Sequence, residues 1–228
     1  MNLCQPDLKY SVELPFRVVP VTAYQQNCTV VKCPQTGDIA VIDPGGDLDR
    51  IQQAIEELDG TPKKILLTHG HLDHVGGTLP LSQLLEIPII GPHRDDDFWI
   101  QQLPAQAKMM GLPPVESFES GQWLQDGDRI SLGVLSFDVI HCPGHTPGHV
   151  VLFCAEHRWA QVGDVLFQGS IGRTDFPRGN HQQLINSIRN KLFPLGDDIR
   201  FVPGHGPMST FGQERQTNPY VGDHALSN

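Results

Sequence analysis

Long apolar runs are missing from this chain of 228 residues. No uninterrupted apolar stretch approaches the roughly 18 residues that a membrane-spanning helix needs. The first four residues, Met1 to Cys4, lack the basic and then apolar pattern of a secretion signal. We therefore expect a soluble, cytoplasmic protein that has no membrane partner.

Positive charge is also scarce. The chain has 16 Lys and Arg residues against 26 Asp and Glu residues, which gives a formal net charge of -10. Such a protein presents a poor electrostatic field to a polyanion. The composition therefore argues against nucleic acid as a partner and against a nuclease activity.

Cysteines are few and are not arranged in pairs. The chain has 5 of them, at positions 4, 28, 33, 142 and 154. An odd number at irregular spacing argues against a disulfide framework and for a reducing compartment. Cys142 lies near a candidate metal ligand, but no second cysteine stands at metal-binding spacing, so we interpret it as a packing residue.

What the chain does have is a dense group of metal-binding side chains. Residues 68–77 read THGHLDHVGG, which places His69, His71, Asp73 and His74 within six positions. Histidines at i and i+2 point to the same side of an extended segment and can bind one ion together. With 11 histidines in the chain, a chance match to this pattern is expected in about one random chain in a thousand. The segment therefore predicts a metal site.

Three further segments read as a strand, then a glycine, then a metal-binding side chain. They deliver His145, Asp164 and His205. Seven nitrogen and oxygen ligands are too many for one tetrahedral ion and enough for two ions that share a carboxylate. We therefore assign one ion to His69, His71 and His145, a second to Asp73, His74 and His205, and a bridging position to Asp164.

Short strands alternate with helices along the chain, and this periodicity by itself indicates a mixed α/β fold. We expect Asp73 and His74 to lie just before the helix over residues 77–85, where the helix dipole favours a bound anion such as hydroxide. The expected strands are 16–23, 28–32, 39–42, 64–67, two within 129–140, 150–153, 159–162 and 199–202, and the expected helices are 48–58, 77–85 and 182–192.

With these motifs together, the chain resembles the metallo-β-lactamase superfamily and, within it, the hydroxyacylglutathione hydrolases, or type II glyoxalases. The resemblance rests on THGHLDHVGG at 68–77, PGHTPGH at 143–149, GD at 163–164, GRTDFPRG at 172–179 and PGHGP at 203–207. It implies a four-layer αβ/βα sandwich, formed here as one domain over residues 1–228, and the same seven metal ligands. The C-terminal helical domain of longer type II glyoxalases has no counterpart after His205.

The activity that the resemblance implies is hydrolysis of S-lactoylglutathione, or of a related hydroxyacyl thioester, to hydroxy acid and thiol. Two divalent metal ions would bind a bridging hydroxide as the nucleophile and would stabilise the oxyanion. Zinc is expected first, with iron or manganese as alternatives, because all three accept His and Asp ligands. Asp73 is the candidate catalytic residue, orienting the hydroxide or accepting its proton. The small-molecule partner is a thioester, expected to be glutathione-based.

Substrate contacts are less well defined by the motifs. Arg173 matches a basic residue of the family in the loop after the bridging aspartate, and Arg173 and Arg178 are candidates for substrate binding. Both could equally be surface charges or ion-pair partners of Asp175. The apolar stretch over residues 97–110 could form a wall of the substrate pocket or belong to the core.

Two other activities remain open at this point. A persulfide dioxygenase shares the ligand loop and the run over residues 172–176, and would use one iron held by His69, His145 and Asp164. A lactonase of the same fold is the other alternative.

Several residues near the motifs are not assigned as ligands. Asp43 is either a residue that fixes the ligand loop or only a turn-forming aspartate before a proline. His149 is expected to hydrogen-bond within its turn. The histidines at 93, 141, 157, 181 and 224 lack the context of a strand that ends in glycine. The sequence does not define the oligomeric state.

Overall fold

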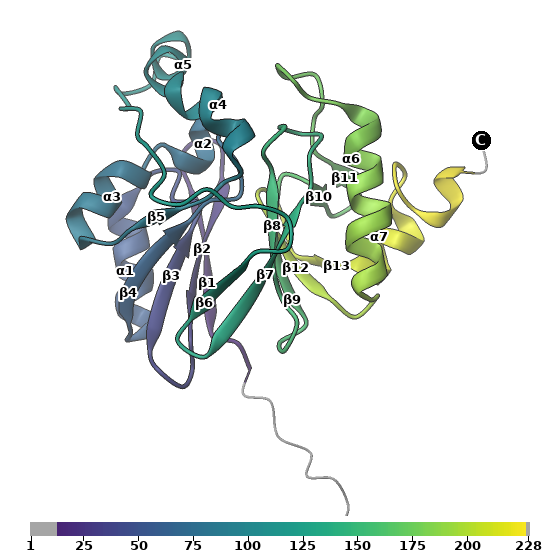
Figure 1. Ribbon diagram of the computed structural model, residues 1–228, viewed down its shortest axis with the longest axis horizontal. Coiled ribbons are helices and arrows are strands. Elements are labelled where there is room, and N and C mark those ends of the chain that lie inside the picture. Colours follow the sequence, from purple (N-terminus) through teal and green to yellow (C-terminus); the bar gives the residue numbers. More distant parts are fainter. Residues whose placement is uncertain (1–12, 227–228) are drawn as a thin grey trace, which may run out of the picture.

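The first of two main sheets has five strands. A computed structural model describes residues 13–226, and Figure 1 shows this sheet on its purple and blue side. The first three strands pair antiparallel in chain order, and β4 and β5 join them in parallel. The strands are β1 (Phe16–Val21), β2 (Gln26–Lys32), β3 (Asp38–Ile42), β4 (Thr61–Leu66) and β5 (Ile89–Ile90).

The second sheet has six strands in the order β13-β12-β9-β8-β7-β6. Strands β12 and β9 pair in parallel, and the other neighbours pair antiparallel. The bounds are β6 (Arg129–Leu132), β7 (Leu135–His141), β8 (Val150–Cys154), β9 (Trp159–Gly163), β12 (Arg200–Pro203) and β13 (Ser209–Thr210). A short hairpin of β10 (Leu166–Phe167) and β11 (Ser170–Ile171) follows β9.

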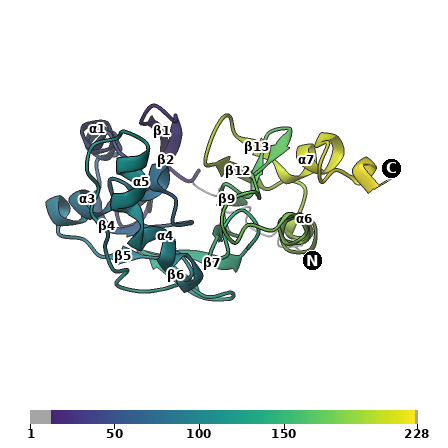
Figure 2. The same cartoon turned by 90° about the horizontal axis from the view of Figure 1, so that it is seen from above.

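Helices cover the outer face of each sheet (Figures 1 and 2). Helices α1 (Leu48–Leu58) and α3 (Thr78–Leu85) lie beside the first sheet, and α6 (His181–Ser187) and α7 (Phe211–Thr217) lie beside the second. In α1 the buried residues Ile51, Ala54, Ile55 and Leu58 recur at i, i+3, i+4 and i+7, the spacing of one helix face.

Three apolar clusters hold these layers together. One joins the first sheet to its helices, one joins residues of the two sheets, and one joins the second sheet to its helices. Val41 packs toward the first helical layer, whereas its neighbours Ala40 and Ile42 pack toward the second sheet, because successive residues of a strand face opposite sides. The architecture is therefore the expected four-layer αβ/βα sandwich.

The helical segments around the ligand loop differ from the expectation. Asp73 and His74 belong to a separate one-turn helix, α2 (Leu72–Val75), instead of preceding α3 directly. Residues 94–109, for which no helix was expected, form a 3-10 turn η1 (Arg94–Asp96), α4 (Asp97–Gln101) and α5 (Leu103–Met109). Helices of one or two turns show too few repeats for an apolar period to be detected.

The helix expected over residues 182–192 is also shorter. It begins at His181, ends at Ser187, and continues as a π-helical turn, η2 (Ile188–Leu192), and a 3-10 turn, η3 (Phe193–Leu195). Leu184, Ile188 and Leu192 nevertheless remain buried along this segment. A further 3-10 turn, η4 (Asp223–Leu226), follows α7.

Four cysteines carry free, buried thiols: Cys28, Cys33, Cys142 and Cys154. Cys142 packs in the third apolar cluster, and its burial raises the pKa of the thiol to about 12, as a packing residue requires. Cys4 lies outside the described residues. No helix among residues 13–226 has both the length and the apolar character that crossing a bilayer takes.

Candidate metal centre

The seven predicted ligands meet where the ends of the two sheets face each other. The first sheet supplies His69 and His71 in the loop after β4, and Asp73 and His74 on α2. The second sheet supplies the other three ligands, each just past a strand end. These are His145 after β7, Asp164 after β9 and His205 after β12.

Three imidazoles form the first group, and all are buried. His71 Nδ1 lies 3.2 Å from His69 Nε2 and 2.9 Å from His145 Nε2. Nitrogens that bind one tetrahedral ion at about 2.1 Å are separated by roughly 3.4 Å, close to these distances. The three nitrogens lie within 4.8 Å of one another, so this group can hold one ion.

The second group consists of Asp73, His74 and His205, whose donor atoms also lie within 4.8 Å of one another. Asp73 Oδ2 lies 3.2 Å from His205 Nε2 and 3.9 Å from His74 Nε2. These donors are two imidazole nitrogens and one carboxylate oxygen, a set that suits zinc, iron or manganese.

Asp164 lies between the two groups. Its Oδ1 is 3.2 Å from His74 Nε2, and its Oδ2 is 3.5 Å from His145 Nε2 and 3.7 Å from His205 Nε2. One carboxylate therefore contacts both groups, as expected for a bridging ligand.

Asp43 and Thr68 orient two of the imidazoles from behind. Asp43 accepts hydrogen bonds from the Thr68 backbone N–H at 2.7 Å and the Thr68 hydroxyl at 2.5 Å, and its Oδ2 lies 3.0 Å from His74 Nδ1. Because the Thr68 hydroxyl donates to Asp43, it accepts from His69 Nδ1 at 3.1 Å. Both histidines thus carry a proton on Nδ1 and direct Nε2 toward the centre. Asp43 fixes the ligand loop and also forms the turn, so both interpretations of this residue hold.

Backbone carbonyls orient two more. His145 Nδ1 donates to the Arg173 carbonyl at 2.7 Å, and His205 Nδ1 donates to the Tyr24 carbonyl at 3.2 Å. His71 is turned the other way round, with Nδ1 inward and a buried Nε2 that has no hydrogen-bond partner among the described residues. The two carbonyls thus fix a proton on Nδ1 of His145 and His205 and direct their Nε2 atoms toward the centre.

Charge at the centre also favours cations. Burial tends to lower the pKa of His74, but Asp164, Asp73 and Asp43 outweigh it and hold that pKa well above its usual value. His74 Nε2 and Asp164 Oδ1 are both buried and lie 3.2 Å apart. Three carboxylates around one imidazole are an excess of negative charge that divalent ions would neutralise. The residues therefore fit a binuclear metal centre.

His149 has a role that the sequence did not reveal. Instead of bonding within its own turn, its Nε2 accepts the backbone N–H of Asp164 at 3.0 Å, and its ring stacks on His69 with centroids 4.6 Å apart. It is fully buried. His149 thus supports the candidate bridging aspartate and His69, and its place in the PGHTPGH run was the only sequence signal for it.

A cavity of about 820 Å³ opens onto the cluster. Trp99 and Phe176 stand beside His71, with ring centroids 4.6 and 4.8 Å from its imidazole. The apolar part of the lining is Leu72, Trp99, Met109, Met110, Phe167, Ile171, Phe176 and Pro177. A mostly apolar hollow with a few convergent polar groups is the usual form of a small-molecule site.

The segment over residues 97–110 serves both functions considered for it. Trp99, Met109 and Met110 line the cavity, whereas Ile100 and Leu103 are buried in the first apolar cluster. The short helices α4 and α5 divide these residues between the cavity and the core.

The two candidate arginines lie at the surface. Arg173 lines the cavity, pairs with Asp175 at 2.8 Å and has its Cζ 4.5 Å from the Phe176 ring. Arg178 lies over the Phe98 ring, with Cζ 4.1 Å from the ring centroid. The ion pair with Asp175 anticipated as an alternative therefore forms for Arg173.

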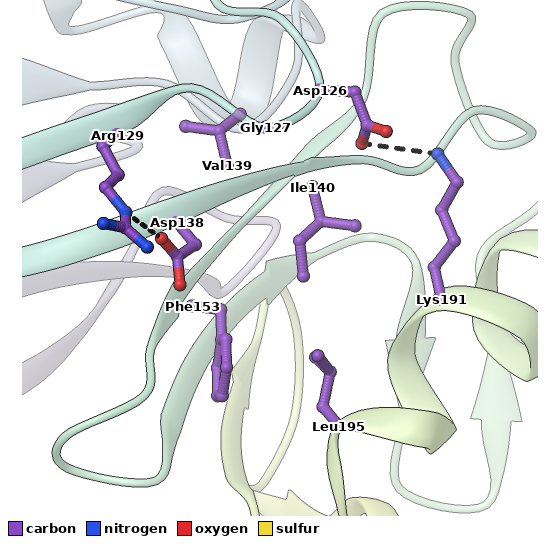
Figure 3. Close-up of a pocket in the computed structure, with 9 residues that line it drawn as sticks. All are labelled: Asp126, Gly127, Arg129, Asp138, Val139, Ile140, Phe153, Lys191 and Leu195. Carbon is purple, nitrogen blue, oxygen red and sulfur yellow. Dashed lines mark hydrogen bonds and ion pairs between the residues drawn. The ribbon is translucent and has the colours of Figure 1, made fainter.

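A second cavity, of about 720 Å³, shares no lining residue with the first (Figure 3). Its charged side chains neutralise each other, because Arg129 pairs with Asp138 at 2.7 Å and Lys191 pairs with Asp126 at 3.4 Å. This cavity has none of the seven ligands, and we do not assign the reaction to it.

A surface group of His93, Asp95 and His141 also has its donor atoms within 4.8 Å of one another. The two imidazoles stack with an interplanar angle of 19° and centroids 4.3 Å apart. Lone pairs in nearly parallel planes do not converge on one point, so we assign no ion to this group.

The buried imidazoles predict acid sensitivity of the chelated protein. Burial, with His145 nearby, lowers the pKa of His71 to about 3. Because the unfolded pKa is about 6.5, stability is lost as pH falls below that value, and His71 alone accounts for about 2 kcal/mol at about pH 5. The pKa values of His69, His145 and His149 are also lowered, chiefly by burial.

The opposite effect of His74 and His205, whose pKa values are raised by neighbouring carboxylates, acts only above about pH 6.5. Asp96, whose pKa is raised to about 6 by burial, opposes the loss within this range, but one carboxyl group is outweighed by four imidazoles with lowered pKa values. We therefore expect the midpoint of thermal unfolding of the chelator-treated protein to fall between about pH 6.5 and pH 5. A midpoint that stayed level or rose over this range would contradict the assignment of neutral, buried imidazoles.

Comparison with known proteins agrees with this geometry. A sequence model of the metallo-beta-lactamase superfamily matches residues 21–205. The hydroxyacylglutathione hydrolase GloC of Haemophilus influenzae is 48% identical over 205 residues, which cover 90% of this chain and 96% of that protein.

Solved structures of similar size superpose closely. The B3 metallo-beta-lactamase BLEG-1 matches with a TM-score of 0.84 and 34% identity, over 91% of this chain and 99% of that one. The protein TTHA1623, solved in a di-iron-bound form, matches with a TM-score of 0.81 and 34% identity, over 90% of this chain and 99% of that one.

Proposed function

The chain belongs to the metallo-β-lactamase superfamily, and from that premise we propose that it is a binuclear metal-dependent thioester hydrolase. It is a metal-dependent hydrolase similar to hydroxyacylglutathione hydrolases. The proposed substrate is S-lactoylglutathione or a related hydroxyacyl thioester. The observation that carries the proposal is the contact of Asp164 with both groups of ligands beside one cavity.

In this proposal His69, His71 and His145 hold one ion, Asp73, His74 and His205 hold the other, and Asp164 bridges them. When bound, two divalent ions supply a hydroxide nucleophile at neutral pH and positive charge for the oxyanion of the intermediate. Zinc is proposed first, with iron or manganese as alternatives. The similar protein TTHA1623 was solved with two irons, so metal analysis has to include iron.

Asp73 is the proposed catalytic residue, and its surroundings define what it does. Burial tends to raise its pKa, but His74 and His205 outweigh this effect and lower the pKa. At neutral pH it is therefore a carboxylate, which accepts a hydrogen bond and orients an attacking water better than it stores a proton. A thiolate leaves without a general acid, so the chain needs no further proton donor for a thioester.

The substrate's acyl end is proposed to lie in the corner between Trp99 and Phe176. These rings are next to His71, so a group within a few bonds of the reacting carbonyl reaches them. The polar glutathione portion would extend past Arg173 at the exposed rim. Arg173 and Arg178 remain proposed substrate contacts, and both stay predictions.

The deciding experiment pairs metal analysis with turnover. Purified protein is expected to contain two divalent ions per chain and to release glutathione from S-lactoylglutathione. A single ion per chain, or no thioester cleavage by fully loaded protein, would overturn the proposal. A lactone and a β-lactam should be tested in parallel, as should oxygen uptake with glutathione persulfide, because turnover of one of these instead would identify the alternative activity.

Removal of one cavity ring tests where the substrate binds. Phe176→Ala deletes an apolar wall, and a loss of about 1.4 kcal/mol of binding corresponds to a roughly tenfold higher KM. The value of kcat should change little, because the apolar ring of Phe176 transfers no proton and is not proposed to contact the leaving thiolate. Tyr220→Ala is the control, since Tyr220 is an exposed aromatic residue that does not line the cavity. Equal effects of both variants would contradict this substrate position.

Two expectations from the sequence remain predictions. The cytoplasmic location is one, and the organisation of residues 1–228 as one domain is the other. Both agree with a small intracellular thioester as the proposed substrate, and neither bears on the geometry of the centre.

A further inference from the structure

Asp96 is an acidic residue buried at the end of η1, outside the seven ligands. Its side chain is completely inaccessible to solvent, and no lysine or arginine is among its partners in the described residues. Burial raises the pKa of this carboxyl to about 6, against the effect of its hydrogen bonds. A buried carboxylate without a cationic partner is costly unless hydrogen bonds satisfy it.

Those hydrogen bonds come from the two loops that carry the first group of ligands. Asp96 Oδ2 accepts from the Gly70 backbone N–H at 2.9 Å and from the Thr146 hydroxyl at 2.7 Å. Asp96 Oδ1 accepts from the Gly148 backbone N–H at 2.6 Å. Gly70 lies between His69 and His71.

Thr146 follows His145 directly, so one carboxylate contacts the loops of all three imidazoles in the first group.

The segment around Asp96 is also closely packed against these two loops. A Cβ atom at Gly148 would lie 2.5 Å from Asp96 N and 2.7 Å from Asp96 Oδ1. A Cβ atom at Gly70 would lie 3.0 Å from the Asp96 carbonyl oxygen and 2.9 Å from Trp99 Cβ. Both glycines therefore allow η1 and the start of α4 to approach the ligand loops.

We propose that Asp96 is a positioning residue for the first metal ion. It holds the loop of His69 and His71 at a fixed distance from the loop of His145, so that the three inward nitrogens converge. Because Asp96 immediately precedes α4, it also places Trp99 beside the same ion. This inference rests on the proposed binuclear function, and it concerns the affinity of one ion only.

Asp96→Asn is the sharpest variant, because it keeps the shape and removes one acceptor. If the amide oxygen of the new side chain faced the Gly148 N–H, the amide nitrogen would face the Gly70 N–H. In the flipped orientation the amide nitrogen would face the Gly148 N–H instead. Either way one backbone donor loses its acceptor. Substitution of groups that orient metal ligands typically lowers metal affinity about 10- to 100-fold, and we expect a loss of that size for one of the two ions.

The measurement is titration of chelated protein with Zn²⁺, together with the absorption spectrum of the Co²⁺-loaded form. Asp96→Asn should bind one ion with unchanged affinity and the other 10- to 100-fold more weakly, with an altered Co²⁺ spectrum. Turnover at saturating Zn²⁺ should recover in large part. Asp97→Asn is the matched control, because the Asp97 side chain accepts a hydrogen bond from Gln101 at 3.1 Å and contacts neither ligand loop by a hydrogen bond within residues 13–226. This variant should bind both ions normally.

Thr146→Val keeps the test open if Asp96→Asn does not fold, since it removes one of the three bonds and preserves side-chain shape. A smaller loss of affinity for the same ion, about tenfold, is expected. Wild-type affinity for both ions and an unchanged Co²⁺ spectrum in either folded variant would overturn the role of Asp96. A single ion in the wild-type protein would overturn the binuclear function itself, and the premise of this inference with it.

Discussion

Asp164→Asn is expected to reduce the metal content from the two ions of the proposed centre to one or fewer and to lower turnover by about 10³- to 10⁵-fold. The reason is the position of the carboxylate. One oxygen faces His74 and the other faces His145 and His205. An amide can present its oxygen to only one side, and the nitrogen on the other side cannot bind a cation.

The measurement is elemental analysis of the purified variant and its rate on S-lactoylglutathione at saturating metal. Asp138→Asn is a suitable control, because Asp138 pairs with Arg129 in the other cavity (Figure 3) and should leave both ions in place. An Asp164→Asn protein that retained two tightly bound ions would show that this residue does not bridge them.

Gly204→Ala is expected to have an effect of similar size without changing any ligand. A Cβ atom at this position would overlap the Asp164 carboxylate and lie 2.6 Å from His74 Cε1. His74 is bonded to Asp43 behind it, and the backbone N–H of Asp164 is bonded to His149, so the Asp164 carboxylate can avoid the new methyl group only by rotating away from its present position. The variant should fold, bind at most one ion and lose at least about 10³-fold in turnover.

Gly206→Ala separates this steric effect from a general sensitivity of the loop. A Cβ atom at Gly206 meets nothing within 4 Å, but its φ of 76° is unfavourable for alanine. This variant should lose about 1–2 kcal/mol of stability and keep both ions. If Gly204→Ala bound two ions as tightly as the wild type, the close packing between residue 204 and the centre would not matter for metal binding.

The clustering of the seven candidate ligands could be predicted because each is marked locally in the sequence. His69, His71, Asp73 and His74 stand in one short run, and the others follow a strand and a glycine. Helix α1 was predicted with its exact bounds for a similar reason, since its apolar residues repeat over three turns. In both cases the information lies within a dozen consecutive residues.

The supporting residues could not be predicted in this way. Asp96 bonds to Gly148, 52 positions later, and Asp43 bonds to His74, 31 positions later. A hydrogen bond between distant segments leaves no periodic or spacing signal in one sequence. The sequence offered a role in fixing the ligand loop as one of two interpretations of Asp43, which follows a predicted strand. Nothing in the sequence around Asp96 distinguishes this residue from its acidic neighbours.

The division of the ligands between the two sheets has a consequence for assembly of the molecule. Four ligands come from the loop after β4 and from α2, and three come from loops of the second sheet. Neither half of the chain therefore contains a complete site, and bound ions would act as a cross-link between the halves. At a free metal concentration about a thousand times the dissociation constant, each ion would add roughly 4 kcal/mol to the free energy needed to separate the two halves.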